Sequence, residues 1–292
     1  MSVVGGMSRV VKGLLSMAME AGAITRFERT VTSIKRLEDD SVKVCHRATT
    51  GDQQKSAVEC AEYDAVIVTV PLPALQQILF SPPLGRAKQR AIRTTEYDEA
   101  TKVAIRFAGE KPPWDATRFP PGSRVETDLD SRQLYFLNDN IVMSYTWGVD
   151  AERLATMTHD MRVERVVQDV ARLIDQDADE LTKKVAQSTS KSWKSDPAFG
   201  GAFTLYHAGN YVDNHCGTIG DDYDPSPTAP YGLHSPVRFT GEHKDPAGHA
   251  WIETSLISVI EELDILASKT KEAWAKVDTE PNDTVCQERQ RQ

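Results

Sequence analysis

Apolar residues recur along the chain with two different periods, which predict a mixture of α-helices and β-strands. Spacings of three and four residues, typical of a helix with one apolar face, occur in three segments: 10–18, 161–174 and 251–263. Alternating or continuous apolar runs, typical of strands, occur at 31–44, 65–70, 100–107, 133–137 and 141–147. Prolines and glycines separate many of these segments, and we find no internal repeat.

One stretch near the C-terminal end combines a strand, a glycine turn, an acidic residue and a helix start. The strand is expected from Val237 to Thr240, and Gly241, Glu242 and a polar loop then lead into a helix at Trp251. A helix N-terminus offers backbone N–H groups to a phosphate, a carboxylate suits a ribose or ribityl hydroxyl, and an indole offers a flat wall. The stretch therefore predicts one edge of a pocket of dinucleotide size.

The strand at 100–107 carries the first candidate for chemistry. Alternation puts its apolar residues on one face, with three others on the opposite face: Lys102, Ala104 and Arg106. A buried ammonium beside a cofactor ring can orient water and stabilise developing negative charge. On periodicity alone, a solvent-facing strand lysine is the simpler interpretation.

The composition argues against several classes of protein. The chain has 292 residues, of which 40% are apolar and 26% charged, and its net charge of −9 argues against nucleic-acid binding. No apolar run approaches the roughly 18 residues that a membrane span needs. The first residues lack the pattern of a signal peptide, so we expect a cytoplasmic protein.

The four cysteines, Cys45, Cys60, Cys216 and Cys286, form no C-x-x-C pair. Cys45 and Cys60 could face each other across a hairpin, but scattered thiols are typical of a reduced intracellular protein, so we expect free thiols. Cys216 and its neighbouring histidine stand near acidic residues at 221–224, in a spacing that fits no zinc or calcium pattern. We therefore predict an acidic loop there and no metal site.

Six motifs, in the same order along the chain, resemble the flavin-dependent amine oxidases and within them the L-amino acid oxidases. They are Gly5-Gly-Met7, Val70-Pro-Leu72 with Phe80-Ser-Pro-Pro-Leu84, Ala100-Thr-Lys-Val103, Tyr145-Thr-Trp-Gly148, Trp193-Lys-Ser-Asp196 with Gly200-Gly-Ala-Phe203, and Phe239-Thr-Gly-Glu242 with His249-Ala-Trp-Ile252. The resemblance runs from residue 3 to residue 264. It covers only the C-terminal half of the family, because the G-x-G-x-x-G fingerprint of the N-terminal half is absent from this chain.

The resemblance implies an α/β fold, in which a Rossmann-like FAD-binding domain is joined to a substrate domain with a mixed β-sheet flanked by helices. The FAD-binding domain is expected to be incomplete and discontinuous, with residues 1–80 and 232–268. Residues 81–231 would form the substrate domain, and 269–292 a polar tail. The missing part would hold the first βαβ unit, whose glycine turn cradles the pyrophosphate.

The resemblance also implies roles for single residues. Lys102 matches a catalytic lysine that holds a water beside the flavin N5. Contacts with FAD are expected from six residues: Val31, Trp193, Glu242, Ala250, Trp251 and Ile252. Trp251 would also form a wall of the substrate site, together with Tyr135 and Phe136. Without the resemblance, the valine and the two tryptophans would be interpreted as packing residues.

The chain departs from the family pattern at four places. Ala250 replaces a glycine, Lys244 replaces a threonine, and the loop between Glu242 and Trp251 is one residue longer. Phe136 stands where L-amino acid oxidases have a tyrosine that helps to hold the substrate carboxylate. The arginine that pairs with this carboxylate belongs to the family's N-terminal half.

The implied activity is oxidative deamination of an amine or L-amino acid, in which a hydride passes from the α-carbon to flavin N5 and oxygen reoxidises the flavin. A half-pocket loses donors to the pyrophosphate, each worth about 1.5–3 kcal/mol. Three hypotheses therefore stay open. The chain is an oxidase of a biosynthetic or catabolic step that a second chain or dimerisation completes, a non-catalytic homologue that acts as a binding or scaffold subunit, or a fragment of a longer oxidase.

Overall fold

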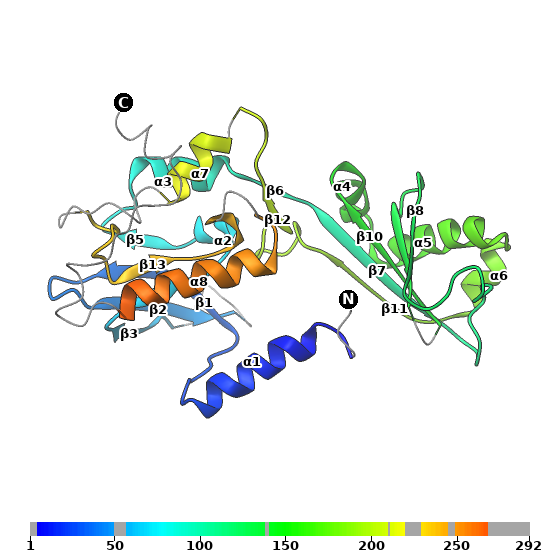
Figure 1. Ribbon diagram of the computed structural model, residues 1–292, viewed down its shortest axis with the longest axis horizontal. Helices are drawn as coiled ribbons and strands as arrows, with labels where there is room; N and C mark the ends of the chain where they lie inside the picture. The colour runs from blue at the N-terminus through cyan, green and yellow to red at the C-terminus, as the bar shows by residue number, and fades with distance from the viewer. Residues whose placement is uncertain are drawn as a thin grey trace.

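The chain forms two lobes that are joined by extended strands (Figure 1). The computed structural model describes residues 5–49, 57–137, 140–209, 211–219, 229–244 and 249–267. The expected acidic loop at 221–224, the polar tail at 269–292 and Cys286 lie outside these residues. Among the described helices, none is both long and apolar enough to cross a membrane.

The first lobe combines a four-stranded sheet, a separate pair of strands and several helices. Its elements are β1 (Arg29–Arg36), β2 (Val42–Ala48), β3 (Glu59–Tyr63), β4 (Val66–Val68), α2 (Leu72–Leu75), β5 (Leu79–Ser81), α3 (Arg86–Thr94), α7 (Tyr211–Ile219), β13 (Val237–Phe239), the 3-10 turn η2 (Glu242–Lys244) and α8 (Ile252–Ala267). The larger sheet has the order β3-β2-β1-β5. Strands β4 and β13 pair with each other in parallel.

The core of the first lobe lies between these sheets and helices. Val42 and Val237 are completely buried in it. Leu84 and Ile92, which fall in the expected substrate domain, also pack in this core. The domain boundaries expected from the resemblance stay a prediction.

The second lobe contains an antiparallel sheet with the order β11-β7-β10-β9-β8. Its elements are β7 (Ala100–Phe107), β8 (Ser123–Glu126), β9 (Gln133–Phe136), β10 (Ile141–Trp147), α4 (Val149–Ala155), α5 (His159–Ile174), α6 (Ala178–Lys183) and β11 (Val185–Ser192). Helix α5 packs on this sheet through Val166, Val167 and Val170, which are completely buried. Its N-cap is Thr158, whose side chain accepts a hydrogen bond from the backbone N–H of Met161.

Two short strands, β6 (Glu96–Asp98) and β12 (Phe203–Leu205), pair with each other where the lobes meet. Strand β6 continues almost directly into β7, so the chain crosses from the first lobe into the second there and returns along β11 and β12 (Figure 1). Helices combined with parallel and antiparallel strands confirm the predicted α/β fold.

Helix α1 (Ser8–Glu20) extends away from both lobes, and none of its residues is buried (Figure 1). Its apolar side chains therefore face solvent, including Val11 and Met17 with about two thirds of their surface exposed, at 66% and 67%. The spacing of apolar residues correctly predicts the helix, but it does not specify what covers its apolar face.

Helix α8 is oriented in the opposite way to the usual amphipathic helix. Four residues on one side are buried: Thr254, Ser258, Glu262 and Ile265. The apolar stripe, which includes Leu256 and Ile260, is exposed. The buried carboxylate of Glu262 forms ion pairs with Arg238 and Lys244, both of which are buried, and these pairs hold the polar side of the helix against the lobe.

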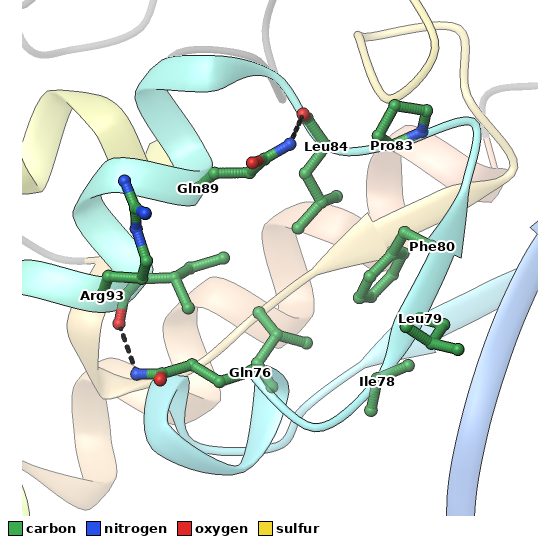
Figure 2. Close-up of a pocket in the computed structure, with 10 residues that line it drawn as sticks. Gln76, Ile78, Leu79, Phe80, Pro83, Leu84, Gln89 and Arg93 are labelled. Atoms are coloured by element: carbon green, nitrogen blue, oxygen red, sulfur yellow. Dashed lines mark hydrogen bonds between the residues drawn. The ribbon is translucent and has the colours of Figure 1, made fainter.

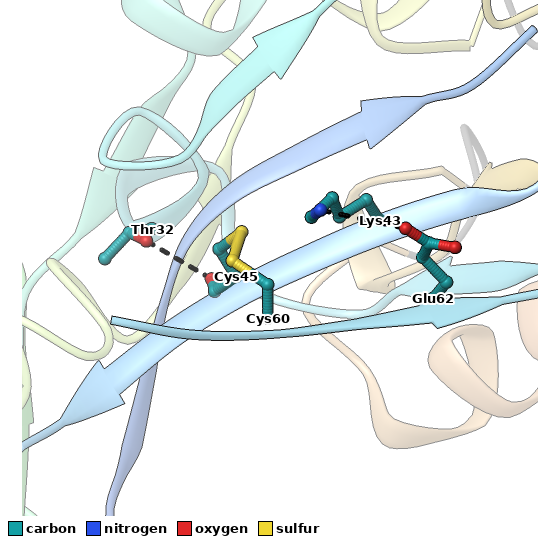
Figure 3. The surroundings of a disulfide bond; sticks show 5 residues. All are labelled: Thr32, Lys43, Cys45, Cys60 and Glu62. Carbon is teal, nitrogen blue, oxygen red and sulfur yellow. Dashed lines mark hydrogen bonds and ion pairs between the residues drawn. A yellow bond between two sulfur atoms is a disulfide. The ribbon is translucent and has the colours of Figure 1, made fainter. Parts of the chain in front are cut away.

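The prediction that the cysteines are free thiols was wrong. Cys45 lies directly opposite Cys60 in the antiparallel pair β2–β3, and the two form a disulfide with their Cα atoms 4.1 Å apart (Figure 3). Cys216 is also disulfide-bonded. The reason is the strand register, which brings two cysteines 15 residues apart in sequence to one position of the hairpin.

Candidate functional site

Lys102 lies on the half-buried face of the second lobe's sheet, as the alternation of β7 predicts. Its neighbours Thr101 and Val103 are completely buried on the opposite face. The Lys102 Nζ atom lies 4.6 Å from the ring centroid of Tyr145 and 5.6 Å from that of Trp193. The ammonium therefore contacts two aromatic rings at distances typical of cation–π interactions.

The electrostatic environment of Lys102 is that of a partly desolvated cation. Burial lowers the pKa of the Lys102 ammonium below its ordinary value. Lys191, its register partner on β11, forms an ion pair with Asp196. For Lys102 no carboxylate partner is found within the described part of the chain. The amine is thus held next to two π faces, and none of the described carboxylates neutralises it.

Tyr145 is a site residue that the motif analysis assigned only to the fold. It lies directly opposite Lys102 in the antiparallel pair β10–β7, and its ring packs against Trp147 with 5.5 Å between centroids. Burial raises the pKa of the Tyr145 hydroxyl, and Tyr135 and Asp98 raise it further. The alternation of β10, combined with a correct register, could have revealed this contact.

The two residues expected at the substrate site lie on opposite faces of β9. Tyr135 is half-buried and pairs in register with Met143 of β10, on the same face as Tyr145. Phe136 is completely buried in the core, where its ring stacks on Phe119 at 4.6 Å. The structure therefore brings Tyr135 to the Lys102 face and does not bring Phe136 there, because successive strand residues point to opposite sides.

Glu242 ties the C-terminal stretch to the junction of the lobes. One carboxylate oxygen accepts hydrogen bonds from the backbone N–H and the hydroxyl of Thr204 on β12, at 3.0 and 2.5 Å. The other accepts a hydrogen bond from the backbone N–H of Ala250 at 2.7 Å. Both oxygens are thus used within the chain, and the oxygen that faces Ala250 retains acceptor capacity for a further donor.

The residues that lead into α8 form a largely exposed edge, in which Ala250 is half-buried. Ala250 has a φ of 73°, in the left-handed region where glycine is favoured, which explains why the family has glycine here. Trp251 and Ile252 are 71% and 66% exposed. Both side chains are therefore open to solvent in this structure. Residues 245–248 of the preceding loop lie outside the described residues.

Lys244, which replaces the family's threonine, points into the protein. Its ammonium pairs with Glu262 and donates a hydrogen bond to the carbonyl oxygen of Phe239 at 3.0 Å. This substitution therefore acts on the packing of α8.

The remaining residue expected to contact FAD is Val31. It lies half-buried on β1 and packs against the core of the first lobe. Five of the six expected residues, from Trp193 to Ile252, belong to the lobe junction or to the start of α8, which lies beside β12 in Figure 1. The arrangement fits one wall of a flavin site, with Glu242 oriented by two elements, and the roles of the individual residues stay predictions.

A separate pocket of about 350 Å³ lies between α2, β5 and α3 (Figure 2). It is lined mainly by apolar side chains such as Ile78, Phe80 and Leu84. The amides of Gln76 and Gln89 at its edge donate to the backbone carbonyls of Ile92 and Leu84. None of its lining residues belongs to the Lys102 face.

Comparison with known proteins supports the resemblance and shows how much of the family is present. An L-amino-acid oxidase of Mus musculus is 33% identical over 264 residues, which are 88% of this chain and 37% of the mouse protein. An L-amino-acid oxidase of Echis ocellatus is 27% identical over 262 residues, or 47% of its length. A putative L-amino-acid oxidase of Bacillus subtilis is 26% identical over 227 residues, or 44% of its length. The chain thus spans less than half of each of these relatives.

The family model described as flavin containing amine oxidoreductase matches residues 1–261. This match covers both lobes, the lobe junction, the Lys102 face and most of α8. The cofactor of this family is a flavin. The chain therefore belongs to the flavin-containing amine oxidoreductases.

Proposed function

We propose that this chain is the C-terminal half of an FAD-dependent oxidase that deaminates an amine or an L-amino acid, and that a second chain or a second copy completes its flavin site. The single observation that carries this proposal is the position of Lys102 between the rings of Tyr145 and Trp193. The chemistry that a flavin supplies is uptake of a hydride from the α-carbon, followed by reoxidation with dioxygen.

Three features of the Lys102 face support a site for a neutral amine. Lys102 keeps a positive charge near the place where substrate and cofactor would meet, which disfavours a second cation. Its lowered pKa makes the ammonium a stronger proton donor to a bound water. The Tyr145 and Trp193 rings provide flat apolar surfaces that exclude solvent from one side.

Two features of the first lobe support completion by another segment. The parallel pair β4–β13 is short, with β13 buried and β4 partly buried. Parallel sheets of only two strands are unusual because their unpaired edges leave backbone groups without partners. The apolar stripe of α8 is exposed over about three turns. The chain's coverage of less than half of its relatives agrees with both features.

A non-catalytic binding or scaffold subunit is the second candidate. Ala250 with its positive φ and Phe136 buried in the core are the specific observations that favour it, because each removes a family feature expected near the cofactor or substrate. A fragment of a longer oxidase is the third candidate, and it shares the observations that favour completion.

The cytoplasmic location expected from the sequence stays a prediction, and the Cys45–Cys60 disulfide weighs against it. Disulfides persist in oxidising compartments and are rare in the reducing cytosol. Intact mass after thiol alkylation, with and without prior reduction, measures how many cysteines are oxidised in protein isolated from its native source. Alkylation of all four cysteines without reduction would restore the cytoplasmic prediction.

The first experiment is an absorbance spectrum of the purified 292-residue chain, before and after incubation with FAD. Visible bands of protein-bound oxidised flavin would support a functional site, and sedimentation would then tell whether the flavin-binding species is a dimer. If the chain stays colourless, the same titration is repeated with the N-terminal half of a relative supplied as a second chain. Failure to bind FAD in both cases would leave the binding or scaffold role.

Peroxide formation from amines and L-amino acids is the activity assay for any flavin-loaded species. Lys102→Met is expected to lower turnover strongly while leaving flavin binding in place. Lys191→Met is the matched control, because it removes an ammonium from the opposing register position on β11 that is already paired with Asp196. Equal losses in the two variants would argue against a special role for Lys102.

A further inference from the structure

Glu99 is a completely buried carboxylate between β6 and β7, in the segment where the chain crosses between the lobes. Burying an ionised carboxylate costs several kcal/mol unless hydrogen bonds compensate for the lost water. Glu99 finds three such donors within the chain. They are the Ser192 hydroxyl at 2.7 Å, the Lys194 backbone N–H at 2.6 Å and the Thr101 hydroxyl at 3.2 Å.

Two of these donors flank Trp193 on the chain. Ser192 is the last residue of β11 and Lys194 begins the following turn, so Glu99 holds the residues immediately before and after the indole. The backbone N–H of Trp193 donates to the carbonyl oxygen of Ala100 at 3.2 Å. Three consecutive residues are therefore attached to the start of β7.

Glu99 is itself held in place from two directions. Its backbone N–H donates to the Asp98 carboxylate at 2.9 Å, and its carbonyl oxygen accepts from the backbone N–H of Gly148 at 3.0 Å, just before α4. The side chain of Lys194 is anchored to the same helix through an ion pair with Glu152. The carboxylate therefore has little freedom to follow Trp193 if that residue moves.

We propose that Glu99 is a positioning residue that holds the Trp193 ring against the Lys102 ammonium. Trp193 is half-buried and lies where β11 leaves the sheet, so ladder hydrogen bonds do not hold it from both sides. The Glu99 carboxylate replaces that support, and the distance of 5.6 Å between Lys102 Nζ and the indole depends on it. Its relevance to catalysis rests on the proposed function, but the contact itself exists in the chain without flavin.

The test is ¹⁹F NMR of the full 292-residue chain labelled with 5-fluorotryptophan. The sequence has five tryptophans, and Trp193→Phe identifies the resonance of Trp193. Removal of the cation by Lys102→Met shifts that resonance in the otherwise unchanged protein. In the Glu99→Ala background the ring is released, so Lys102→Met is expected to leave the Trp193 resonance where it is.

Asp169→Ala is the matched control. Asp169 is also a buried carboxylate of the second lobe, and it accepts hydrogen bonds from a backbone N–H and a hydroxyl, both of Ser131, at 2.9 and 2.7 Å. Removal of the Asp169 carboxylate is expected to destabilise the same lobe without removing a contact to Trp193 or its neighbours. The change in the Trp193 resonance that Lys102→Met causes, called here the Lys102-dependent shift, is therefore expected to persist in Asp169→Ala at its full size.

If Glu99→Ala does not fold by circular dichroism, Glu99→Gln takes its place. Glutamine presents one acceptor oxygen to the three donors, so the Lys102-dependent shift is expected to fall to an intermediate size. An undiminished shift in either folded Glu99 variant would overturn the proposal, as would its loss in the Asp169→Ala control. Because the readout needs neither flavin nor turnover, the two proposals fail separately. A chain that binds no FAD either alone or with the N-terminal half of a relative, but keeps the Glu99 effect, would refute the proposed function alone.

Discussion

The second lobe buries most of its large apolar side chains in its own core, whereas the first lobe leaves several of them exposed. In the second lobe, α5 covers one face of the sheet and the aromatic rings of the core pack against each other. In the first lobe, the stripe of α8 and the nearby strand residue Leu79, which is 75% exposed, face solvent. The difference teaches that one lobe buries most of its apolar surface within the chain, whereas the other leaves part of it exposed.

The ion pairs of the first lobe explain how an uncovered lobe can still hold its C-terminal helix. The ion pairs of Glu262 with Arg238 and Lys244 hold the polar side of α8 against the lobe, and the apolar side of the helix therefore faces outward. A buried charged cluster adds little net stability but strongly disfavours alternative packings when one member would be left unpaired. The orientation of α8 therefore follows from electrostatics rather than from its apolar pattern.

The comparison of the lobes is tested most directly by one truncation to alanine in each lobe. Phe136→Ala in the closed core is expected to lower the free energy of unfolding by about 3–5 kcal/mol, because it leaves a cavity beside Phe119. Ile260→Ala on α8, where the side chain is 58% exposed, is expected to change it by less than about 0.5 kcal/mol. Urea denaturation of both variants measures the two effects. A loss of several kcal/mol for Ile260→Ala would mean that the α8 stripe is covered in solution.

The second prediction concerns the anchor of α8. Glu262→Gln leaves the Arg238 and Lys244 cations buried without a full counter-charge, so we expect a loss of about 3–5 kcal/mol in the free energy of unfolding. Glu253→Gln, on the exposed side of the same helix, is the control and is expected to be nearly neutral. Equal denaturation midpoints for the two variants would contradict the electrostatic explanation.

The third prediction concerns the backbone at the start of α8. Ala250→Gly removes the steric cost of a left-handed conformation, so it is expected to raise the free energy of unfolding by about 0.5–1 kcal/mol even though glycine is more flexible in the unfolded chain. Ala155→Gly at the end of helix α4 is expected to act in the opposite direction, by a similar amount. Thermal unfolding distinguishes the two signs. A loss of stability in Ala250→Gly would show that the positive φ is not maintained in solution.

The smallest predicted effect is the pH dependence that Lys102 contributes. Because its pKa is lower in the folded chain than the ordinary value of 10.5, the unfolded chain binds more protons between these two pKa values. The free energy of unfolding is therefore expected to rise as the pH increases through the folded pKa toward 10.5. Well above 10.5 the Lys102 amine is neutral in both the folded and the unfolded chain, so the rise ends there.

Lys102→Met is expected to flatten this rise and to increase stability at neutral pH by less than about 1 kcal/mol. Lys191→Met keeps Lys102 in place and should retain the rise. Denaturation curves collected from neutral to alkaline pH provide the measurement. A slope that survives in Lys102→Met would assign it to other groups.

The sequence by itself determined several of the elements and the two faces of strand β7. The alternation of β7 correctly separated Lys102 from the buried face, the spacing at 161–174 correctly predicted α5, and the ordered motifs identified the family. These features depend on local geometry, because the periods of helices and strands are properties of the backbone.

Only the tertiary structure decided which residues meet and which faces are covered. Strand register brought Tyr145 to Lys102 and Cys45 to Cys60, and a register is set by pairing between segments rather than within them. Burial of Glu262 with two cations reversed the expected orientation of α8, and Glu99 became notable only once Ser192 and Lys194 were brought beside it. Each of these depends on contacts between distant parts of the chain, which periodicity does not specify.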